Sequence, residues 1–485
     1  MPLSRIVKEP IDLEPLFPDR TSEEPIGAQL VRRLRNAIET GFFPPSSRLL
    51  PSRELAQRLG VARNTVTYAL DQLIAEGYLE ARVGDGTYVT ATVHLNKKRP
   101  PATSRVLPVS ARAIASTKAR LDEVGTSVGP LRVGSPSLTE FPLHTWQRLA
   151  RVHLANAGDF LDYGQSSGLL ALREAISRHI AQFRGVVADP EQISIVEGTQ
   201  GALQLVASIL ATSGDAIVVE DPCYVLARSA FVARGLSLRP IDVDDEGIRT
   251  NDLPDAAALA YVTPSHQFPL GGALPRERRA ELLAWARKTG AYVVEDDYDS
   301  EFDAHPLPAL QSLDRDERVI YVGTFSKTLA PGLRIGYVVV PPHLAEVFRL
   351  ARAIGSLGSS AELQATLADF IAQGHFSRHV RRMTGIYERR RRIVIEAFAG
   401  LPSGFKIGPA QTGLHVSVMA PPDFDDARAA NALPNGWRVL PLSAMCIKRT
   451  DCKGLVMGFS AGSDAEVSAA ATALGRVFRQ DVLFE

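Results

Sequence analysis

Residues 323–336 read Gly-Thr-Phe-Ser-Lys-Thr-Leu-Ala-Pro-Gly-Leu-Arg-Ile-Gly, and they place Lys327 shortly after an apolar run. That run, residues 319–322, is Val-Ile-Tyr-Val, a composition typical of a buried β-strand. A lysine held just past the end of such a strand is partly desolvated, and its amine can then form a Schiff base. Lys327 is therefore the first candidate for covalent chemistry.

A second apolar run, residues 291–296, ends in acid at Glu295 and Asp296. Runs of this kind alternate with helical stretches, which predicts an α/β fold with a mainly parallel sheet. Because the carboxyl ends of parallel strands meet at one edge, we expect Asp296 and Lys327 to lie together there. Pyridoxal phosphate requires a lysine for its aldehyde and a carboxylate for its pyridinium nitrogen. A solvated loop lysine and a helix N-cap explain each residue alone, but not the pair.

The length and composition restrict the class of protein. With 485 residues, the chain is expected to hold more than one domain. Its formal net charge of zero gives no overall sign of a nucleic-acid partner, although a small basic domain can be balanced by an acidic one. The three cysteines have no metal or redox spacing, and no metal site is expected. The N-terminus lacks a signal-peptide pattern and no apolar run reaches membrane-spanning length, which predicts a cytoplasmic protein without a membrane partner.

The N-terminal region has the pattern of a small DNA-binding module. Residues 1–25 are rich in proline and acid and are expected to form a loose arm. Residues 26–41, 52–60 and 63–77 predict three helices with apolar stripes. The second and third helices are joined through a glycine-containing turn, as in a helix-turn-helix. Residues 78–89 predict a β-hairpin that forms a wing.

The start of the third helix is expected to enter the major groove of double-stranded DNA. Side chains at that position can read base edges, while neighbouring groups hold phosphate. A solvated helix face explains any single arginine here, but the ordered set favours DNA. The candidates for base contacts are Arg63, Asn64, Thr65 and Thr67, and the candidates for phosphate contacts are Arg53 and the wing backbone at Gly84 and Gly86.

Residues 26–89 resemble the winged helix-turn-helix of GntR-type regulators. The resemblance rests on Leu50-Pro-Ser-Arg-Glu-Leu-Ala, Val61-Ala-Arg-Asn-Thr-Val and Gly84-Asp-Gly-Thr-Tyr-Val. Ala62 departs from the family, which usually has a serine capping the recognition helix, a loss that costs about 1 kcal/mol. A DNA-binding domain is therefore expected over residues 26–90, followed by a linker over 91–128.

The α/β alternation begins at Gly129 and carries further site candidates. Residues 192–205 predict a strand, a glycine-bounded turn and a helix start, where backbone amides form an anion site. The next strand ends near Tyr224, an aromatic that can stack on a flat ring. No Gly-x-Gly-x-x-Gly follows a strand, which disfavours a dinucleotide fold. The anion site is expected at the amides of Gly198, Thr199 and Gln200.

Residues 129–485 resemble the fold-type-I aminotransferases. The motifs Glu295-Asp-Asp-Tyr298 and 323–334 are most similar to the aminotransferase-like half of MocR-type regulators, which fuse a GntR-type winged helix to this domain. The resemblance implies a larger domain with a mainly parallel sheet, a smaller α+β subdomain and bound pyridoxal phosphate. The resemblance also implies a role for each site residue. Lys327 forms the internal aldimine, Asp296 pairs with the pyridinium nitrogen, Tyr298 hydrogen-bonds the phenolate oxygen and Tyr224 stacks on the ring. The phosphate is bound by Gly198, Thr199, Gln200, Thr324 and Arg334, and Tyr163 reaches the phosphate of a neighbouring subunit in a homodimer.

Two positions depart from the aminotransferase pattern. Phe268 replaces an asparagine that lies close to the phenolate oxygen, and His266 or Gln267 is a candidate substitute. Val456 stands where the arginine for the substrate carboxylate is expected. Either the effector is not an ordinary amino carboxylate, or pyridoxal phosphate itself is the signal, or a nearby cation serves instead. The candidate cations are Lys448, Arg449 and Lys453.

Three functions follow from these patterns. The first is a transcriptional regulator, not an enzyme, whose aminotransferase-like domain senses pyridoxal phosphate or an amine or amino-acid-like effector through Lys327, with a slow transamination half-reaction at most. The second is an active aminotransferase with an accessory DNA-binding module, which Val456 disfavours. The third is a nucleic-acid-binding protein without a cofactor, for which Lys327 and Asp296 would be a coincidence. The regulator accounts for both halves of the chain.

Overall fold

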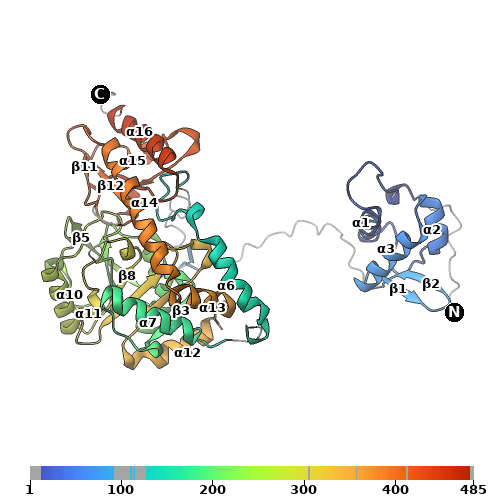
Figure 1. The fold of residues 1–485 in the computed structure, drawn as a ribbon, viewed down its shortest axis with the longest axis horizontal. Helices are drawn as coiled ribbons and strands as arrows, with labels where there is room; N and C mark the ends of the chain where they lie inside the picture. Colours follow the sequence, from blue (N-terminus) through green and yellow to red (C-terminus); the bar gives the residue numbers. More distant parts are fainter. Residues whose placement is uncertain are drawn as a thin grey trace. The chain divides into compact units, whose positions relative to one another are not determined.

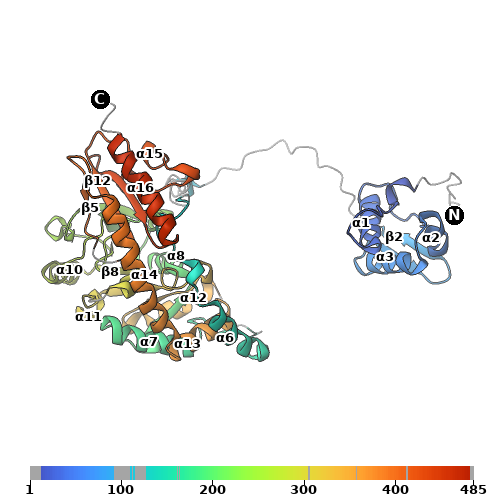
Figure 2. The ribbon, with the colours of Figure 1, turned by 45° about the horizontal axis from the view of Figure 1, so that its top comes forward.

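The computed structural model describes residues 13–91, 110–111, 113–114, 127–160, 162, 164–303, 306–356, 358–410 and 413–480. The chain divides into two compact units, residues 1–108 and 109–485 (Figures 1 and 2). Most of the linker expected over 91–128 lies outside the described residues. Across these described ranges, every helix is too short or too polar to cross a lipid bilayer.

The first unit contains a helix-turn-helix followed by a two-stranded antiparallel wing. The turn between the paired helices contains Gly60, whose φ of 63° lies in the left-handed region that glycine favours. Leu34, Leu59, Val66 and Leu73 meet in its core. The elements are η1 (Glu14–Leu16), α1 (Ile26–Glu39), α2 (Ser52–Leu59), α3 (Arg63–Ala75), β1 (Leu79–Arg82) and β2 (Gly86–Val89).

The described part of the expected arm packs against this module. Leu13 and Leu16 are buried in the same core, at 5% and 0% exposure. Arg20 donates a hydrogen bond of 2.6 Å to the carbonyl of Gly60 in the helix-helix turn. Residues 13–24 thus differ from the loose arm expected from their proline and acid content, because two leucines supply apolar surface that the module buries.

The second unit is built on an eight-stranded sheet with the order β3-β10-β9-β8-β7-β4-β5-β6. The run β9-β8-β7-β4-β5 is parallel, and β10 is antiparallel to both of its neighbours. The strands are β3 (Ile193–Val196), β4 (Ala216–Asp221), β5 (Ser237–Asp244), β6 (Gly247–Ile248), β7 (Leu259–Val262), β8 (Tyr292–Asp297), β9 (Val319–Thr324) and β10 (Gly336–Val339).

This topology brings several chain segments to one edge of the sheet. Because β3 and β9 are both antiparallel to β10, their carboxyl ends lie at the same edge. The start of β10 lies there too, since that strand runs in the opposite direction. The residues that follow β3, β4, β7, β8 and β9 therefore meet the residues that precede β10.

Helices cover both faces of the sheet. Ile320 and Val322 of β9 pack with α8, α9 and α12, whereas Tyr321 packs with α6, α7 and α13 and Val319 with α10. This alternation is the layered arrangement expected for a mainly parallel α/β sheet. The helices are α6 (Leu143–Ala155), α7 (Leu170–Arg184), α8 (Gly198–Leu210), α9 (Val225–Ala233), α10 (Arg276–Thr289), α11 (Leu310–Leu313), α12 (Ala345–Gly355) and α13 (Ala361–Ala372).

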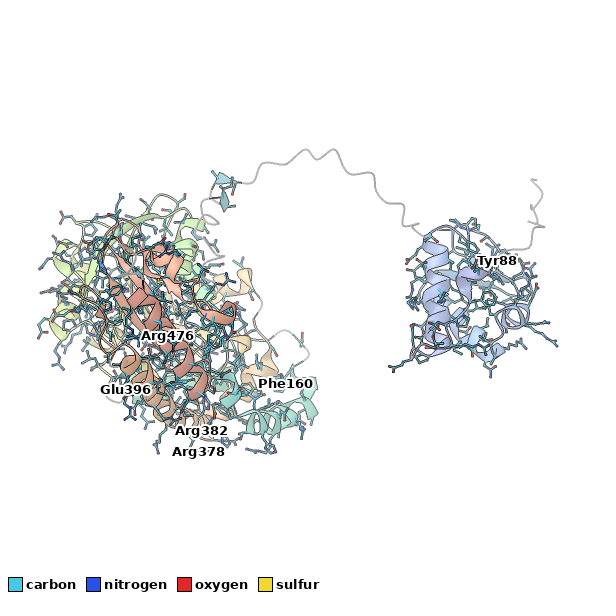
Figure 3. The ribbon with its side chains drawn as sticks, turned by 90° about the horizontal axis from the view of Figure 1, so that it is seen from above. Tyr88, Phe160, Arg378, Arg382, Glu396 and Arg476 are labelled. Carbon is cyan, nitrogen blue, oxygen red and sulfur yellow. The ribbon has the colours of Figure 1, made fainter. Side chains whose placement is uncertain are left out.

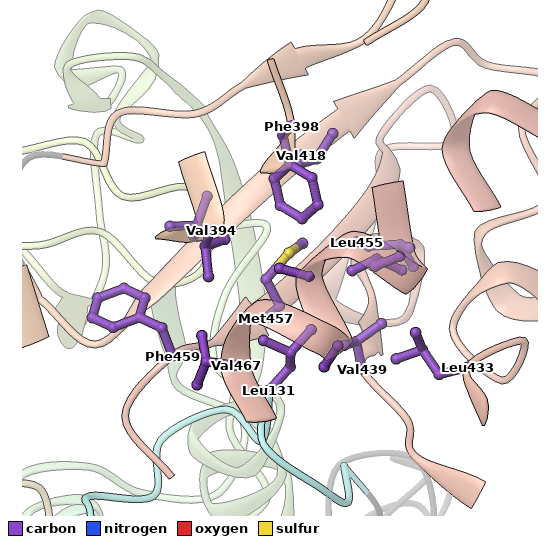
Figure 4. Packing of buried hydrophobic residues seen from close by; sticks show 14 of the residues in the cluster. Leu131, Val394, Phe398, Val418, Leu433, Val439, Leu455, Met457, Phe459 and Val467 are labelled. Carbon is purple, nitrogen blue, oxygen red and sulfur yellow. The ribbon is translucent and has the colours of Figure 1, made fainter. Parts of the chain in front are cut away.

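The C-terminal part forms a smaller subdomain on an antiparallel sheet with the order β11-β12-β14-β13. Figure 4 shows its core, where Val394 and Phe398 meet Val418 and Met457. The elements are α14 (His375–Ala397), β11 (Lys406–Ile407), β12 (His415–Ala420), α15 (Asp426–Ala429), β13 (Leu440–Pro441), β14 (Lys453–Gly458) and α16 (Asp464–Gln480).

Helix α14 links the two subdomains of this unit. Its 23 residues pack against α13 on the large subdomain and against α16 on the small one (Figures 1 and 2). Short 3-10 helices complete the unit: η2 (Leu138–Glu140), η3 (Ala157–Phe160), η4 (Pro190–Gln192), η5 (Thr250–Asp252), η6 (Ser300–Phe302), η7 (Pro331–Leu333), η8 (Pro342–Leu344), η9 (Pro434–Gly436) and η10 (Leu442–Met445).

Candidate functional sites

A pocket of about 230 Å³ lies at the carboxyl edge of the large sheet. Segments that follow β3, β4, β7, β8 and β9 contribute to it, as does the segment before β10. Residues of β12, β13 and η10 in the small subdomain close it from the other side. Its lining includes Thr199, Gln200, Tyr224, Asp296, Tyr298, Thr324, Lys327 and Arg334, all of which are candidates from the sequence.

Lys327 follows β9, and its amine faces the segment before η2. Its Nζ donates a hydrogen bond of 2.8 Å to the carbonyl of Gly134. Burial lowers the pKa of Lys327, although the negative charges of Asp299 and Asp296 oppose this shift. A lysine whose protonated form is disfavoured reacts more readily with an aldehyde.

Asp296 lies near the end of β8, and its side chain is only partly satisfied. Its Oδ2 accepts a hydrogen bond of 2.7 Å from the hydroxyl of Tyr261. Its Oδ1 is buried and has no hydrogen-bond partner among the described residues. Burial raises the pKa of Asp296 to about 7, and the Tyr261 bond opposes the shift. A buried acceptor of this kind suits a cationic N–H donor.

The first turn of α8 and Arg334 together form an anion-binding corner. A Cβ at Gly198 would lie 3.5 Å from Arg334 Nη1, and Arg334 Nη2 donates a hydrogen bond of 2.8 Å to the carbonyl of Glu197. The side-chain nitrogen of Gln200, Nε2, is buried and has no hydrogen-bond partner among the described residues. Free amides at a helix start, a guanidinium and the hydroxyl of Thr324 are donors that a phosphate group requires.

The two tyrosines expected to contact a ring both line the pocket. Tyr224 precedes α9, and its ring meets Phe268 edge-on with centroids 5.8 Å apart. The hydroxyl of Tyr298 donates a hydrogen bond of 2.9 Å to the carbonyl of His266. Tyr163, the residue expected to reach a neighbouring subunit, lies outside the described residues.

His266 and Gln267, the candidate substitutes for the asparagine that Phe268 replaces, contact other residues of the protein. The amide of Gln267 donates to the carbonyls of Pro222 and Phe268 at 3.0 and 2.8 Å. His266 Nδ1 lies 3.0 Å from Asp299. Neither His266 nor Gln267 lines the pocket, whereas Phe268 does.

The candidate cations near Val456 also lie outside the pocket. Lys448 pairs with Asp242 at 3.7 Å, Arg449 with Asp451 at 3.2 Å, and Lys453 with Asp426 at 3.7 Å. Val456 itself is fully buried in an apolar cluster. None of these three cations therefore takes the place of a carboxylate-binding arginine in this arrangement.

The pocket residues that sequence reasoning missed include Tyr261, Gly134 and His415. Tyr261 lies within an apolar strand, and its hydroxyl reaches Asp296 on the neighbouring strand. Gly134 contributes a carbonyl from a segment 193 residues away from Lys327. These contacts join distant parts of the chain, and no local pattern marks them.

The start of α3 is exposed in the first unit. Ala62 is its N-cap and makes no side-chain cap bond. Arg63, Asn64 and Thr67 are exposed and Thr65 is half-buried. The start of the recognition helix is therefore available for contact with a duplex.

The candidate phosphate contacts are exposed as well. Arg53, Gly84 and Gly86 are all accessible, and both glycines have positive φ angles. Sequence reasoning did not name Arg48 among the candidate phosphate contacts. Its Nε lies 3.0 Å from the place that a Cβ would occupy if Gly86 carried one. Figure 3 labels Tyr88 on the wing, where the Arg82 guanidinium lies 4.2 Å from the centre of its ring.

Comparisons with known proteins agree with this division of the chain. Residues 26–89 match the family "Bacterial regulatory proteins, gntR family", and residues 130–444 match "Aminotransferase class I and II". The chain is 39% identical to the probable rhizopine catabolism regulatory protein MocR of Rhizobium meliloti, over 78% of either chain. It is 32% identical to the pyridoxine biosynthesis transcriptional regulator PdxR of Corynebacterium glutamicum, over 93% of this chain and 94% of that protein.

Among solved structures, the second unit resembles the kynurenine aminotransferase of Pyrococcus horikoshii in complex with PMP. The TM-score is 0.70 at 26% identity, and the match covers 77% of this chain and 97% of that protein. The large mainly parallel sheet thus has the fold-type-I aminotransferase arrangement.

Proposed function

The chain belongs to the MocR-type transcriptional regulators, which join a GntR-type winged helix to an aminotransferase-like domain, and from this we propose that its pocket binds pyridoxal phosphate and senses an amine. It is a DNA-binding regulator with an aminotransferase-like domain. An alternative signal is pyridoxal phosphate itself. The proposed place of action is the cytoplasm.

The observation that carries the proposal concerns Asp296 Oδ1, which finds no hydrogen-bond partner in the described part of the chain and shares a pocket with the Lys327 amine. A pyridinium N–H would satisfy this buried acceptor and supply the positive charge that burial of a carboxylate requires. Bound there, pyridoxal phosphate would supply an aldehyde that forms a covalent bond with a primary amine. Lys327 would hold that aldehyde.

The remaining pocket residues fit the other parts of the cofactor. Tyr224 would contact the ring face. The Tyr298 hydroxyl, which donates to the His266 carbonyl in this structure, would redirect its proton to the phenolate oxygen. The donors of the anion-binding corner would hold the phosphate, whose negative charge suits both a helix start and a guanidinium. These donors are the amides of Gly198, Thr199 and Gln200, the Thr324 hydroxyl and the Arg334 guanidinium.

We propose that the domain regulates rather than turns over a substrate efficiently. Its structural neighbours are aminotransferases, so a slow half-reaction is compatible with the fold. The buried Val456, however, offers no charge to an amino acid carboxylate. Steady-state transamination at roughly 1–1000 per second would favour the enzyme alternative.

We further propose that the protein works as a homodimer. Helices α6 and α12 expose apolar side chains that water would solvate poorly. An effector can shift DNA binding only by its differential affinity for two states of such a dimer, typically about 1–3 kcal/mol. The exposed side chains are Leu143, Val152 and Leu154 on α6 and Val347, Leu350 and Ile354 on α12, at 42–89% exposure.

A footprint on the DNA upstream of the protein's own gene tests the proposal. The protein is loaded with pyridoxal phosphate, and a panel of amines, amino acids and sulfonates is added at fixed salt. We expect one protected site whose pattern changes with one class of compound. Absence of protection under every condition would favour the enzyme alternative.

Lys327→Ala separates the two functions of the chain. We expect this variant to lose the visible absorbance of lysine-bound pyridoxal phosphate while retaining a folded winged helix, measured by circular dichroism and by binding to nonspecific DNA. Lys288→Ala is the matched control, because Lys288 is 73% exposed and pairs with Asp255 outside the pocket. Retention of the absorbance band in Lys327→Ala would contradict the assignment of this lysine.

A further inference from the structure

The small subdomain presents an uncharged wall to the pocket. In its antiparallel sheet, Val456 pairs with Ser417 on one side and with Leu440 on the other, so these three side chains point to the same face. Leu440 lines the pocket, whereas Val456 lies beside it in the same apolar cluster and does not line the pocket. The other apolar lining residues are Leu414 and Met445 in the small subdomain, Val225, Leu226 and Phe268 in the large subdomain, and Val133.

Within the described part of the chain, two groups bring positive charge to the pocket lining. Among the described residues that line it, Lys327 and Arg334 are the only lysine or arginine. Arg334 lies beside the first turn of α8 and is bonded to the Glu197 carbonyl. Lys327 lies at the position proposed for the aldehyde.

His415 does not add a charge to the wall. It is buried, and burial holds the pKa of His415 well below its ordinary value. One of its ring nitrogens, Nε2, lies 3.0 Å from the carbonyl of Pro269. A neutral ring already engaged with the backbone offers little to an anionic ligand.

A further cation, Arg132, lines a separate hollow with Ser135 and Thr139. Its charge contributes to lowering the pKa of Lys327, so it lies within electrostatic range of the pocket. Its neighbours Val133 and Gly134, rather than Arg132 itself, line the pocket. Arg132 is therefore the competing candidate for an anionic ligand group, and its removal belongs in the test.

We propose that the effector is a primary amine with an apolar body and without a carboxylate or sulfonate beside the amine. This inference rests on the proposed function. The effector amine would displace the Lys327 amine at the aldehyde carbon: one C=N bond would form as the bond to Lys327 breaks, and Lys327 would be released as a free amine. The apolar wall favours a hydrocarbon body. A carboxylate buried against that wall would lose its hydration without gaining a partner, which disfavours amino acids.

Matched pairs of compounds test the assignment in the full-length protein loaded with pyridoxal phosphate. The probes are phenethylamine against phenylalanine and isopentylamine against leucine, each pair differing by one carboxylate. Isothermal calorimetry and the visible absorbance are recorded together. We expect at least one amine to bind roughly tenfold more tightly than its amino acid, because an unpaired buried carboxylate is costly.

The outcomes of this experiment are distinguishable. Equal or tighter binding of both amino acids would overturn the inference, as would binding of neither amine. A protein that never acquires the visible band contradicts the proposed function. In that case, a calorimetric preference for the amines would still support the uncharged wall.

Variants that add a charge to the wall provide the converse test. Val456→Arg is expected to shift the preference toward the amino acids by roughly tenfold, since a guanidinium pairs with a carboxylate, whereas Val456→Met is the neutral control. Leu226→Arg adds a guanidinium at a half-buried position and serves if an arginine at Val456 prevents folding. Arg132→Ala is expected to leave the preference unchanged. A larger preference for the amines in Arg132→Ala, which would show that Arg132 holds the carboxylate of the amino acids, would overturn the inference. No shift in either arginine variant that folds would overturn it as well.

Discussion

At the scale of single residues, Asp296 contributes to the way in which the stability of the second unit changes with pH. Its Oδ1 lacks a partner among the described residues, and burial raises its pKa to about 7. The unfolded chain releases this proton at a much lower pH, near the ordinary pKa of about 4. Ionised Asp296 therefore destabilises the fold unless a cation lies beside it.

We predict that Asp296→Asn removes a pH-dependent loss of stability from the apoprotein. Between about pH 5 and pH 7, the folded wild type keeps a proton that the unfolded chain has already lost, so its free energy of unfolding should fall by about 2–3 kcal/mol relative to the variant and level off above pH 7. Urea denaturation of both proteins at several pH values measures this difference. Asp255→Asn, at a carboxylate that is 98% exposed, is the control. A difference between wild type and Asp296→Asn that stays constant with pH would contradict the assigned effect of burial.

Arg63→Ala tests the DNA-contact surface at the same scale. Arg63 is exposed at the first position of α3, where a guanidinium can reach a base edge. Loss of one such contact should weaken operator binding by about 1–3 kcal/mol. Binding to operator and to random DNA, measured by fluorescence anisotropy at the same salt, checks this, while the absorbance of bound pyridoxal phosphate should not change. An equal loss on random DNA would assign Arg63 to phosphate instead.

The sequence was sufficient to predict that Lys327 and Asp296 lie in one pocket, because each follows or ends an apolar run and parallel strands bring such ends together. It was not sufficient to find Tyr261 or Gly134, whose bonds to these residues depend on which strands are neighbours. The burial of Leu13 and Leu16 was also missed, because the surrounding prolines and acids hide a two-residue apolar signal.

At the scale of elements, α3 begins without a side-chain cap. Ala62 has the extended backbone of an N-cap residue, with φ of −65° and ψ of 142°, but no oxygen to accept from the first amides. Since the same turn of helix carries the candidate base contacts, the missing cap lowers the stability of the DNA-contact element itself.

Ala62→Ser should therefore stabilise the first unit. A serine Oγ in this backbone can accept a hydrogen bond from an amide of the first turn, a gain of about 1 kcal/mol. Hydrogen exchange of the α3 amides in the full-length protein measures the effect. Ala62→Val, which adds volume without an acceptor, is the control and should give no protection. Equal protection in both variants would show that the cap bond is not the cause.

At the scale of the whole molecule, the chain consists of two compact units with separate cores. We predict that pyridoxal phosphate stabilises only the unit that contains the pocket. At about 100 times its dissociation constant, a ligand adds about 2.7 kcal/mol to the free energy of unfolding of the unit that binds it. Differential scanning calorimetry should show one transition that moves to higher temperature and one that does not. An equal shift of both transitions would indicate that the units unfold together.

Helix α14 would transmit a rotation between the two subdomains of the second unit. Its 23 residues span about 34 Å, and it contacts both subdomains. Rotation of the small subdomain by about 10° about a point near α13 would carry the far end of such a rod through about 6 Å. A small rotation of the subdomain around a ligand at the subdomain boundary would thus cause a larger displacement at the end of α14 that lies beside α16.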